Sequence, residues 1–253
     1  MKVVILAGGL GSRLAEETSV RPKPMVEIGG MPILCHILNT YAHFGYNEFI
    51  IAAGYKSEVF KEYFYNYLMH HSDMVVKLRE GKISFENIAV PDWELHIADT
   101  GVKTQTGGRL FKLKHLLNET LMVTYGDGVG NVNIDELVRF HRSHGKLGTV
   151  TAVHPLPRFG NLEVEGSAVK KFSEKPLQQG LINGGFFVFE PAVFEFLGQD
   201  VPLEREPLER IAASGQLMAF LHTGFWHQMD TVHDRQVLQA LCDSGNPPWN
   251  VWQ

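Results

Sequence analysis

The sequence predicts an α/β fold: a mixed, mostly parallel sheet flanked by helices, with an inserted β-hairpin region. Uncharged strand-like runs alternate with amphipathic helical patterns near the N-terminus, and this order gives parallel strands joined by right-handed crossovers. The first run ends at a glycine-rich turn, the place where open sheets of this kind meet their ligands. Because 253 residues can bury a substantial core and no linker or repeat interrupts them, one domain is expected over residues 1–253.

The N-terminal part of the chain predicts two strand–helix pairs. Val3–Ala7 carries no charge and ends at two glycines, which indicates a buried parallel strand. Apolar spacing over residues 33–41 predicts an amphipathic helix, and residues 48–55 predict the second parallel strand. The spacing over residues 56–69 predicts a further helix with aromatic side chains on one face.

The pattern then changes, because residues 74–100 alternate polar and apolar and predict short strands, arranged as a hairpin over one edge of the sheet. Further along, the sequence predicts strands at 121–125, 149–153 and 184–189, helices at 134–144, from Pro191 and from near Val232, and a second hairpin made by 162–164 and 169–172. Five residues near strand ends are expected to share one cleft: Gly8, Gly54, Asp99, Asp127 and Asn183.

The composition excludes several classes of protein. Hydrophobic residues make up 44% and the formal net charge is −5, so no nucleic-acid partner is expected. Cys35 and Cys242 lie far apart in apolar patterns, which argues against a disulfide framework and a structural zinc site. No run has the apolar length of a signal-peptide core or a membrane span, so we expect no membrane association and a cytoplasmic location.

The loop after the first strand has the composition of a phosphate-binding site. Gly8, Gly9 and Gly11 let the backbone approach a ligand and can turn N–H groups toward an anion. Ser12 and Arg13 add a hydroxyl donor and a planar cation suited to phosphate oxygens. The loop therefore predicts a polyphosphate ligand.

Lys23 stands between two prolines, which restrict the backbone and so limit where its ammonium can reach. Two familiar phosphate loops are excluded, since Leu14 replaces the third glycine of the dinucleotide motif and no Gly-Lys-Ser/Thr follows the loop. What remains, L-A-G-G-x-G-S-R-L followed by P-K-P-M, resembles the signature of the sugar-1-phosphate nucleotidylyltransferases.

Two carboxylates are candidate metal ligands. Asp127 follows a predicted buried strand and lies between two glycines, where its oxygens suit Mg²⁺ shared with phosphate and water. Asp-Gly is also a common turn, and Asp230 could equally cap the helix that begins near Val232. The two carboxylates are stronger candidates as a pair, because nucleotidyl transfer needs a metal that bridges the triphosphate and the attacking phosphate.

Three further positions carry groups that suit a sugar phosphate. Lys175 offers an ammonium for the phosphate, while Glu174 and Asn183 offer partners for hydroxyl groups. A surface hairpin turn with solvated charges is the alternative. The chain has 12 histidines, among them His141 and His144 at helical spacing, but no third ligand is placed with that pair and no histidine metal site is expected.

Nearly the whole chain resembles the glucose-1-phosphate cytidylyltransferase family, a branch of the sugar-1-phosphate nucleotidylyltransferases. The stretches that carry the likeness include LAGGLGSRL, PKPMVEIGG, DTG, TGGRL, TYGDG, INGGFFV, MDT and the terminal PPWNVW. DTG with TGGRL, MVEIGG and the tryptophan-rich end are more specific to the cytidylyl group than the general signature. Ser12 stands where the family often has Thr, and Arg21 where Lys is common, so the hydroxyl and the charge are kept.

The resemblance implies a single nucleotidyltransferase domain with the Rossmann-like fold of nucleotide-diphospho-sugar transferases. It implies an enzyme that transfers the cytidylyl group of CTP to α-D-glucose 1-phosphate, giving CDP-glucose and pyrophosphate in nucleotide-sugar biosynthesis. Mg²⁺ is the implied cofactor, with Mn²⁺ able to substitute, and a homo-oligomer such as a hexamer is the implied assembly.

Carried over by matching motif, the site residues fall into functional groups. Arg13 and Lys23 would be catalytic and act on the phosphates, and Asp127 and Asp230 would hold the metal. The nucleotide would be bound by Leu6, Ala7, Gly8, Gly9, Leu10, Gly11, Ser12, Arg13, Lys23, Thr104, Arg109 and Gly126. The sugar phosphate would be bound by Tyr125, Glu174, Lys175 and Asn183.

The implied mechanism is electrostatic, because the attacking phosphate oxygen is already ionised and needs no general base. Arg109 could donate to the O2 of cytosine or to phosphate, while an acceptor such as a backbone carbonyl must receive the cytosine amine. Two alternatives stay open: the same chemistry with UTP or dTTP, and a non-catalytic regulatory domain on the same fold.

Overall fold

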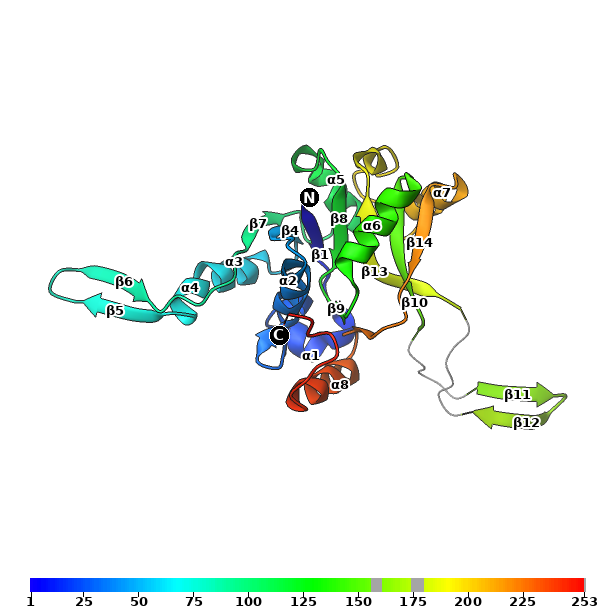
Figure 1. Cartoon of the computed structure of the whole chain (residues 1–253). Helices are drawn as coiled ribbons and strands as arrows, with labels where there is room; N and C mark the ends of the chain where they lie inside the picture. The colour runs from blue at the N-terminus through cyan, green and yellow to red at the C-terminus, as the bar shows by residue number, and fades with distance from the viewer. Residues whose placement is uncertain (156–160, 174–179, 253) are drawn as a thin grey trace.

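The structure, a computed structural model, describes residues 1–155, 161–173 and 180–252. A seven-stranded sheet forms its centre, in the order β14-β10-β13-β8-β1-β4-β7, and helices pack against it (Figure 1). The strands of this sheet are β1 (Val3–Ala7), β4 (Glu48–Ala53), β7 (Glu94–Asp99), β8 (Leu121–Tyr125), β10 (Gly148–Val153), β13 (Ile182–Phe189) and β14 (Leu217–Leu221).

The sheet is mixed and mostly parallel, which confirms the predicted fold class. β1 is parallel to both β4 and β8, and the pairs β4–β7 and β10–β14 are parallel too. β13 runs antiparallel to its neighbours β8 and β10. The carboxyl ends of β1 and β8 therefore open on the same edge of the sheet, because Leu6 and Tyr125 are register partners.

Both faces of the sheet are buried, which explains the lack of charge in β1. Val3 and Ile5 pack into the core on one face, while Val4 and Leu6 pack into the core on the other. A parallel strand covered on both sides needs an apolar residue at every position.

Eight α-helices and four short 3₁₀ helices occur in the described residues. The predicted helix over residues 56–69 divides at Asn66, and the helix predicted from Pro191 is a short 3₁₀ helix. The bounds are α1 (Ala15–Thr18), α2 (Ile33–His43), α3 (Ser57–Tyr65), α4 (Tyr67–His70), α5 (Thr106–Lys112), α6 (Ile134–His144), α7 (Glu206–Ala213), α8 (Val232–Asp243), η1 (Ser12–Leu14), η2 (Lys23–Met25), η3 (Lys114–Leu116) and η4 (Pro191–Glu195).

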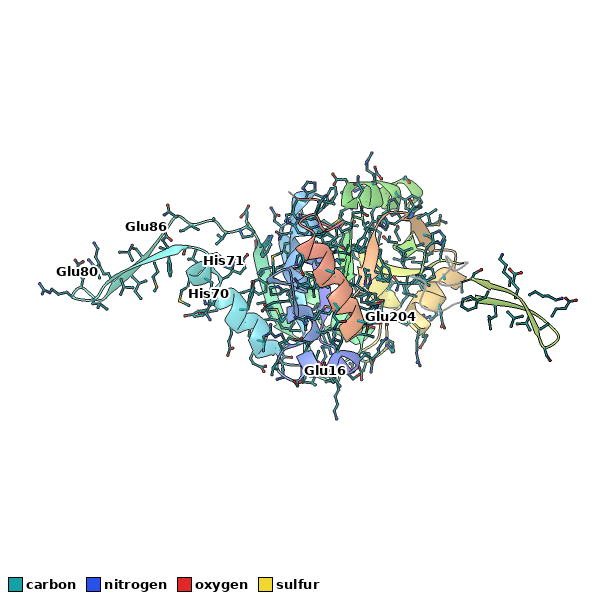
Figure 2. All side chains as sticks on the ribbon, turned by 90° about the horizontal axis from the view of Figure 1, so that it is seen from below. Glu16, His70, His71, Glu80, Glu86 and Glu204 are labelled. Atoms are coloured by element: carbon teal, nitrogen blue, oxygen red, sulfur yellow. The ribbon has the colours of Figure 1, made fainter. Side chains whose placement is uncertain are left out.

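Two hairpins project from opposite sides of the molecule (Figure 1). One is made by β5 (Asp73–Lys77) and β6 (Lys82–Glu86), the other by β11 (Asn161–Glu165) and β12 (Ala168–Ser173). Figure 2 shows Glu80 and Glu86 on the β5–β6 hairpin, away from the body. The expectation for residues 74–100 was wrong in one respect, since β7 joins the main sheet beside β4 rather than the hairpin.

Two small antiparallel pairs complete the fold: β2 (Glu27–Ile28) with β3 (Met31–Pro32), and β9 (Gly128–Gly130) with β15 (Trp226–Gln228). None of the helices in the described ranges combines the length and apolar character needed to cross a membrane.

The C-terminal segment returns to pack beside α2. Trp249 is fully buried, and its Nε1–H donates to Nδ1 of His36 at 3.1 Å. Phe225, which precedes β15, stacks on the Trp249 ring with centroids 5.6 Å apart. Trp249 therefore belongs to the core that supports β9 and β15.

Candidate active site

A pocket of about 490 Å³ opens at the carboxyl ends of β1 and β8. The predicted site residues that line it are Leu6, Ala7, Gly8, Gly9, Gly11, Ser12, Arg13, Lys23, Thr104, Arg109, Tyr125, Gly126, Asp127 and Asp230. The other lining residues, which were not predicted as site residues, are Pro24, Gln105, Thr106, Glu204 and Gln228.

The loop after β1 is shaped by close approaches that only glycine allows. A Cβ on Gly8 would overlap the guanidinium of Arg109. Gly11 has φ of +65°, the left-handed region that favours glycine, and its carbonyl accepts from Thr18 Oγ1 at 3.1 Å. The loop thereby turns from β1 into η1, and Ser12 and Arg13 reach the pocket.

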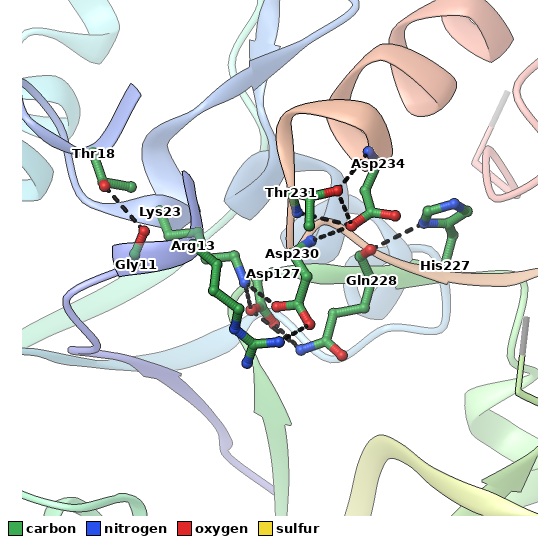
Figure 3. A network of polar contacts seen from close by, with 10 residues as sticks. All are labelled: Gly11, Arg13, Thr18, Lys23, Asp127, His227, Gln228, Asp230, Thr231 and Asp234. Carbon is green, nitrogen blue, oxygen red and sulfur yellow. Dashed lines mark hydrogen bonds and ion pairs between the residues drawn. The ribbon is translucent and has the colours of Figure 1, made fainter. Parts of the chain in front are cut away.

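Four charged side chains meet at one side of the pocket (Figure 3). Lys23 Nζ lies 2.6 Å from Asp127 Oδ2 and 2.6 Å from Asp230 Oδ1. Arg13 Nη1 lies 2.9 Å from Asp230 Oδ2. Burial by itself lowers the pKa of Lys23, but attraction and hydrogen bonds from the two carboxylates outweigh it and the pKa is raised. The ammonium stays charged at neutral pH.

The two carboxylates come from distant parts of the chain and are joined by the β9–β15 pair. Gln228 is the register partner of Gly128, and Met229 N–H donates to the carbonyl of Asp127 at 2.8 Å. Gln228 Nε2 also approaches Asp127 Oδ2 at 3.3 Å (Figure 3). Asp127 and Asp230 therefore flank one point, as the prediction of a shared metal requires.

The backbone at Asp230 is fixed by the start of α8. Asp234 Oδ2 accepts from the backbone N–H groups of Asp230 at 3.1 Å and Thr231 at 2.8 Å, and Thr231 Oγ1 caps the N–H of Asp234. Burial would raise the pKa of Asp234, but these hydrogen bonds prevail and lower it. The helix cap thus belongs to Thr231, which leaves the carboxylate of Asp230 for the pocket.

The donor set at Asp127 and Asp230 fits a hard divalent cation. Carboxylate oxygens are ligands that Mg²⁺ prefers, and it completes its shell with phosphate oxygens and water. Across the described residues, no group of three or more His, Cys, Asp or Glu side chains is placed to hold a metal ion. Any ion bound here would therefore complete its shell with oxygens of the substrates and water, because the described residues place two carboxylates at this point.

Arg109 is buried behind the glycine loop. Its Nη2 donates to the carbonyl of Gly8 at 2.8 Å, and its Nη1 donates to Thr100 Oγ1 at 2.6 Å and to the carbonyl of Gly101 at 2.8 Å. Burial lowers the pKa of Arg109, against the attraction of nearby carboxylates. The guanidinium thereby ties the glycine loop to the segment after β7, and in this geometry it braces the pocket wall.

Tyr125, at the end of β8, connects two elements at the pocket rim. Its hydroxyl donates to Glu204 Oε1 at 2.7 Å and accepts from Asn183 Nδ2 at 3.1 Å. Burial is the main reason that its pKa is raised, and the neighbouring Glu204 adds to it. Asn183 therefore reaches the site through Tyr125 rather than as a lining residue.

Some predicted residues are not brought to the pocket wall. Leu10 is 57% exposed and lies outside the lining. Gly54 and Asp99 lie behind the wall, where Gly54 approaches Arg109 and Asp99 Oδ1 accepts from the N–H of Gly101. Glu174 and Lys175 lie outside the described residues.

Comparison with known proteins identifies the family of the chain. Residues 2–227 match the nucleotidyl transferase family. The chain is 47% identical to a glucose-1-phosphate cytidylyltransferase of Salmonella typhi, with 100% of both chains covered. It is 41% identical to a probable glucose-1-phosphate cytidylyltransferase of Bacillus subtilis, again over 100% of both chains.

A solved structure shows the same fold at lower identity. It is a putative glucose-1-phosphate thymidylyltransferase from Bacillus anthracis in complex with sucrose, with a TM-score of 0.67 and 19% identity. The match covers 96% of this chain and 95% of that chain. The likeness therefore extends over nearly the whole fold.

Proposed function

The chain belongs to the nucleotidyl transferase family and, within it, to the glucose-1-phosphate cytidylyltransferases, and on that premise we propose that it makes CDP-glucose and pyrophosphate from CTP and α-D-glucose 1-phosphate. The observation that carries the proposal is the full-length identity of 47% to a curated enzyme of that name. The cluster of Arg13, Lys23, Asp127 and Asp230 in the strand-end pocket supports it, because this chemistry joins two polyanions.

The pocket binds the triphosphate along the glycine loop. Backbone N–H groups of Gly8, Gly9, Gly11 and Ser12, with the Ser12 hydroxyl and the Arg13 guanidinium, supply donors for phosphate oxygens. Lys23 neutralises charge on the transferring phosphate from its fixed place between two prolines. Leu6, Thr104 and Arg109 form the nucleoside end of the pocket, and Gly126 lets the ribose approach the end of β8.

The residues accelerate the reaction by alignment and charge neutralisation. A phosphate oxygen of the sugar phosphate attacks the α-phosphorus in line with the departing pyrophosphate, so the new P–O bond forms as the α–β bond breaks. The attacking oxygen is already ionised near neutral pH and needs no general base. Tyr125 and Asn183, with Glu174 and Lys175 from the segment outside the described residues, orient the sugar phosphate.

Mg²⁺ is the proposed cofactor, with Mn²⁺ able to substitute, and Asp127 and Asp230 would hold it. When bound, the ion neutralises phosphate charge and fixes the two reacting groups relative to each other. Chelation should abolish product formation, and Asp127→Asn and Asp230→Asn should each raise the Mg²⁺ concentration needed for activity. Because both would act on one ion, the double variant should lose less than the sum of the single losses.

The enzyme is further proposed to act as a homo-oligomer in the cytoplasm, with no nucleic acid or membrane partner. Exposed apolar side chains on the two projecting hairpins support self-association, since monomers rarely expose such surfaces. The free thiols Cys35 and Cys242 suit a reducing compartment.

A direct test is to incubate the chain with CTP, glucose 1-phosphate and Mg²⁺ and to separate the products. We expect CDP-glucose and pyrophosphate in equal amounts. Formation of neither product under saturating substrates would refute the proposed function and would favour the regulatory alternative.

A further inference from the structure

We propose that Glu204 is a specificity-determining residue of this pocket, whose carboxylate accepts a hydrogen bond from a ring hydroxyl of a bound substrate. The ring is either the glucosyl ring or the ribose, which present the same chemistry. The inference rests on the proposed function, since both rings belong to the substrates assigned there. Glu204 lines the same pocket as Lys23 and Asp127, and Figure 2 shows it on the body of the molecule.

The carboxylate of Glu204 is held in place from two elements. Tyr125, at the end of β8, donates its hydroxyl to Oε1 at 2.7 Å. Thr106, at the start of α5, donates its hydroxyl to Oε2 at 2.7 Å and in turn accepts from Leu203 N–H at 2.8 Å. Each carboxylate oxygen can accept a further hydrogen bond, so the group is fixed in position and still has acceptor capacity.

Charge decides what Glu204 can bind. Its two recorded partners are neutral hydroxyls, whereas Asp127 and Asp230 are paired with the cations Lys23 and Arg13. An anion paired with neutral groups repels phosphate oxygens, so Glu204 suits the uncharged part of the substrates. The phosphates instead suit the cationic side of the pocket, which Lys23 and Arg13 form.

The neighbours of Glu204 favour hydroxyl groups over the amine of the base. The carboxylate, the Tyr125 hydroxyl and the Asn183 carboxamide form one continuous chain of hydrogen bonds. This chain offers acceptors and donors side by side, and a ring hydroxyl can use both because it donates and accepts. The exocyclic amine of cytosine needs acceptors only.

The test compares substrates that have or lack one ring hydroxyl. CTP is compared with dCTP, and glucose 1-phosphate with its 2-, 3-, 4- and 6-deoxy analogues, for the wild-type chain, Glu204→Gln and Glu204→Ala. For the hydroxyl that Glu204 accepts, the wild type should prefer the intact substrate by about 10- to 100-fold in kcat/KM, the usual effect of a charged hydrogen bond. Glu204→Ala should reduce that preference to a few-fold, and Glu204→Gln should fall between the two.

Glu209→Gln is the matched control, since Glu209 is an exposed carboxylate on α7 outside the pocket lining. It should keep every wild-type kcat/KM ratio between intact and deoxy substrates. The thermal unfolding midpoint of each variant checks its folding. Loss of preference with dCTP assigns the contact to the ribose, and loss with one deoxy sugar assigns it to the glucosyl ring. If the kcat/KM ratios between intact and deoxy substrates are unchanged in Glu204→Ala, the proposal is overturned. A change only in the kcat/KM ratio between CTP and UTP would overturn it too. If the wild type makes no product, the proposed function fails first, so the two failures are distinguishable.

Discussion

Lys23 contacts both candidate metal ligands, and this contact predicts how the site responds when the residue is removed. Lys23→Ala is expected to lower kcat by about 10²–10³-fold, because it removes a preorganised cation from the transferring phosphate. Its ammonium also lies between the oxygens that a divalent ion would use, so the variant should bind Mn²⁺ more tightly than the wild type in the absence of nucleotide. Pyrophosphate release measures the first effect, and electron paramagnetic resonance of free Mn²⁺ measures the second.

Lys61→Ala is the control for that experiment, since Lys61 is exposed on α3 and lies outside the pocket lining. It should leave turnover and Mn²⁺ binding unchanged. A Lys23→Ala variant with near-normal kcat would show that Lys23 does not act on the transferring phosphate.

The contacts of Arg109 indicate that its replacement affects folding as well as CTP binding. Arg109→Ala would remove the charged donor to the carbonyls of Gly8 and Gly101, so we expect the free energy of unfolding to fall by about 2 kcal/mol. The KM for CTP should rise because the glycine loop loses its brace, while the KM for glucose 1-phosphate should change much less. Urea unfolding and initial-rate kinetics measure these effects, with the exposed Arg79→Ala as control. Unchanged stability together with a raised KM for CTP would instead mean that Arg109 contacts the nucleotide itself.

Single residues could be predicted from the sequence where a short motif contains them. Lys23 and Asp127 are of this kind, and the structure brings both to the pocket. Glu204 could not be found in this way, because its partner Tyr125 is 79 residues away and no motif surrounds it. The bracing contacts of Arg109 were equally hidden, since most of them are made to backbone carbonyls, which any sequence supplies.

At the scale of elements, the C-terminal segment predicts a pH-dependent stability. His36 Nδ1 accepts from Trp249 Nε1–H, so its proton lies on Nε2, 2.9 Å from the carbonyl of Ile28. Burial lowers the pKa of His36 below the ordinary value of 6.5, against the effect of its backbone hydrogen bonds. Protonation of His36 would place a second proton on Nδ1, and this proton would face the Trp249 N–H, which is also a donor.

Between this lowered pKa and 6.5 the unfolded chain binds more protons than the folded chain, so stability should fall as the pH falls below about 6.5. The slope is at most about 1.4 kcal/mol per pH unit for each such histidine, and His141, whose pKa is also lowered by burial, adds to it. Urea unfolding from pH 8 to 5 measures the slope. His36→Gln should flatten it, whereas the exposed His70→Gln should not, and equal slopes in His36→Gln and the wild type would contradict this account.

Elements with strong periodicity could be predicted, and those set by tertiary contact could not. α6 has the predicted bounds, because Asn133 caps its start and Gly145 ends it. α5 contains two glycines, which are poor helix formers, so its sequence does not predict a helix. A Cβ on Gly107 or Gly108 would meet the backbone of residues 199–201, so these glycines allow the helix to pack closely there.

At the scale of the whole molecule, the two projecting hairpins predict self-association. Leu78 and Ile83 on the β5–β6 hairpin are 88% and 62% exposed, and Phe172 on β12 is 62% exposed. Burial of such side chains against a second copy would stabilise an oligomer by the hydrophobic effect. The double variant Leu78→Ser/Ile83→Ser should therefore shift the sedimentation coefficient toward that of a monomer. Glu80→Gln in the turn of the same hairpin should not, and a wild-type chain that sediments as a monomer would refute the proposed homo-oligomer.

Base selectivity tests most sharply whether this strand-end pocket transfers a cytidylyl group to glucose 1-phosphate. The most direct measurement is kcat/KM for pyrophosphate release with glucose 1-phosphate and each of ATP, GTP, UTP, dTTP and CTP. We expect CTP to be preferred over every other nucleotide by at least about 100-fold, since a site that receives the C4 amine leaves a buried acceptor unpaired against a uracil or thymine carbonyl. Equal use of UTP or dTTP, or release of pyrophosphate with none of the five, would contradict it.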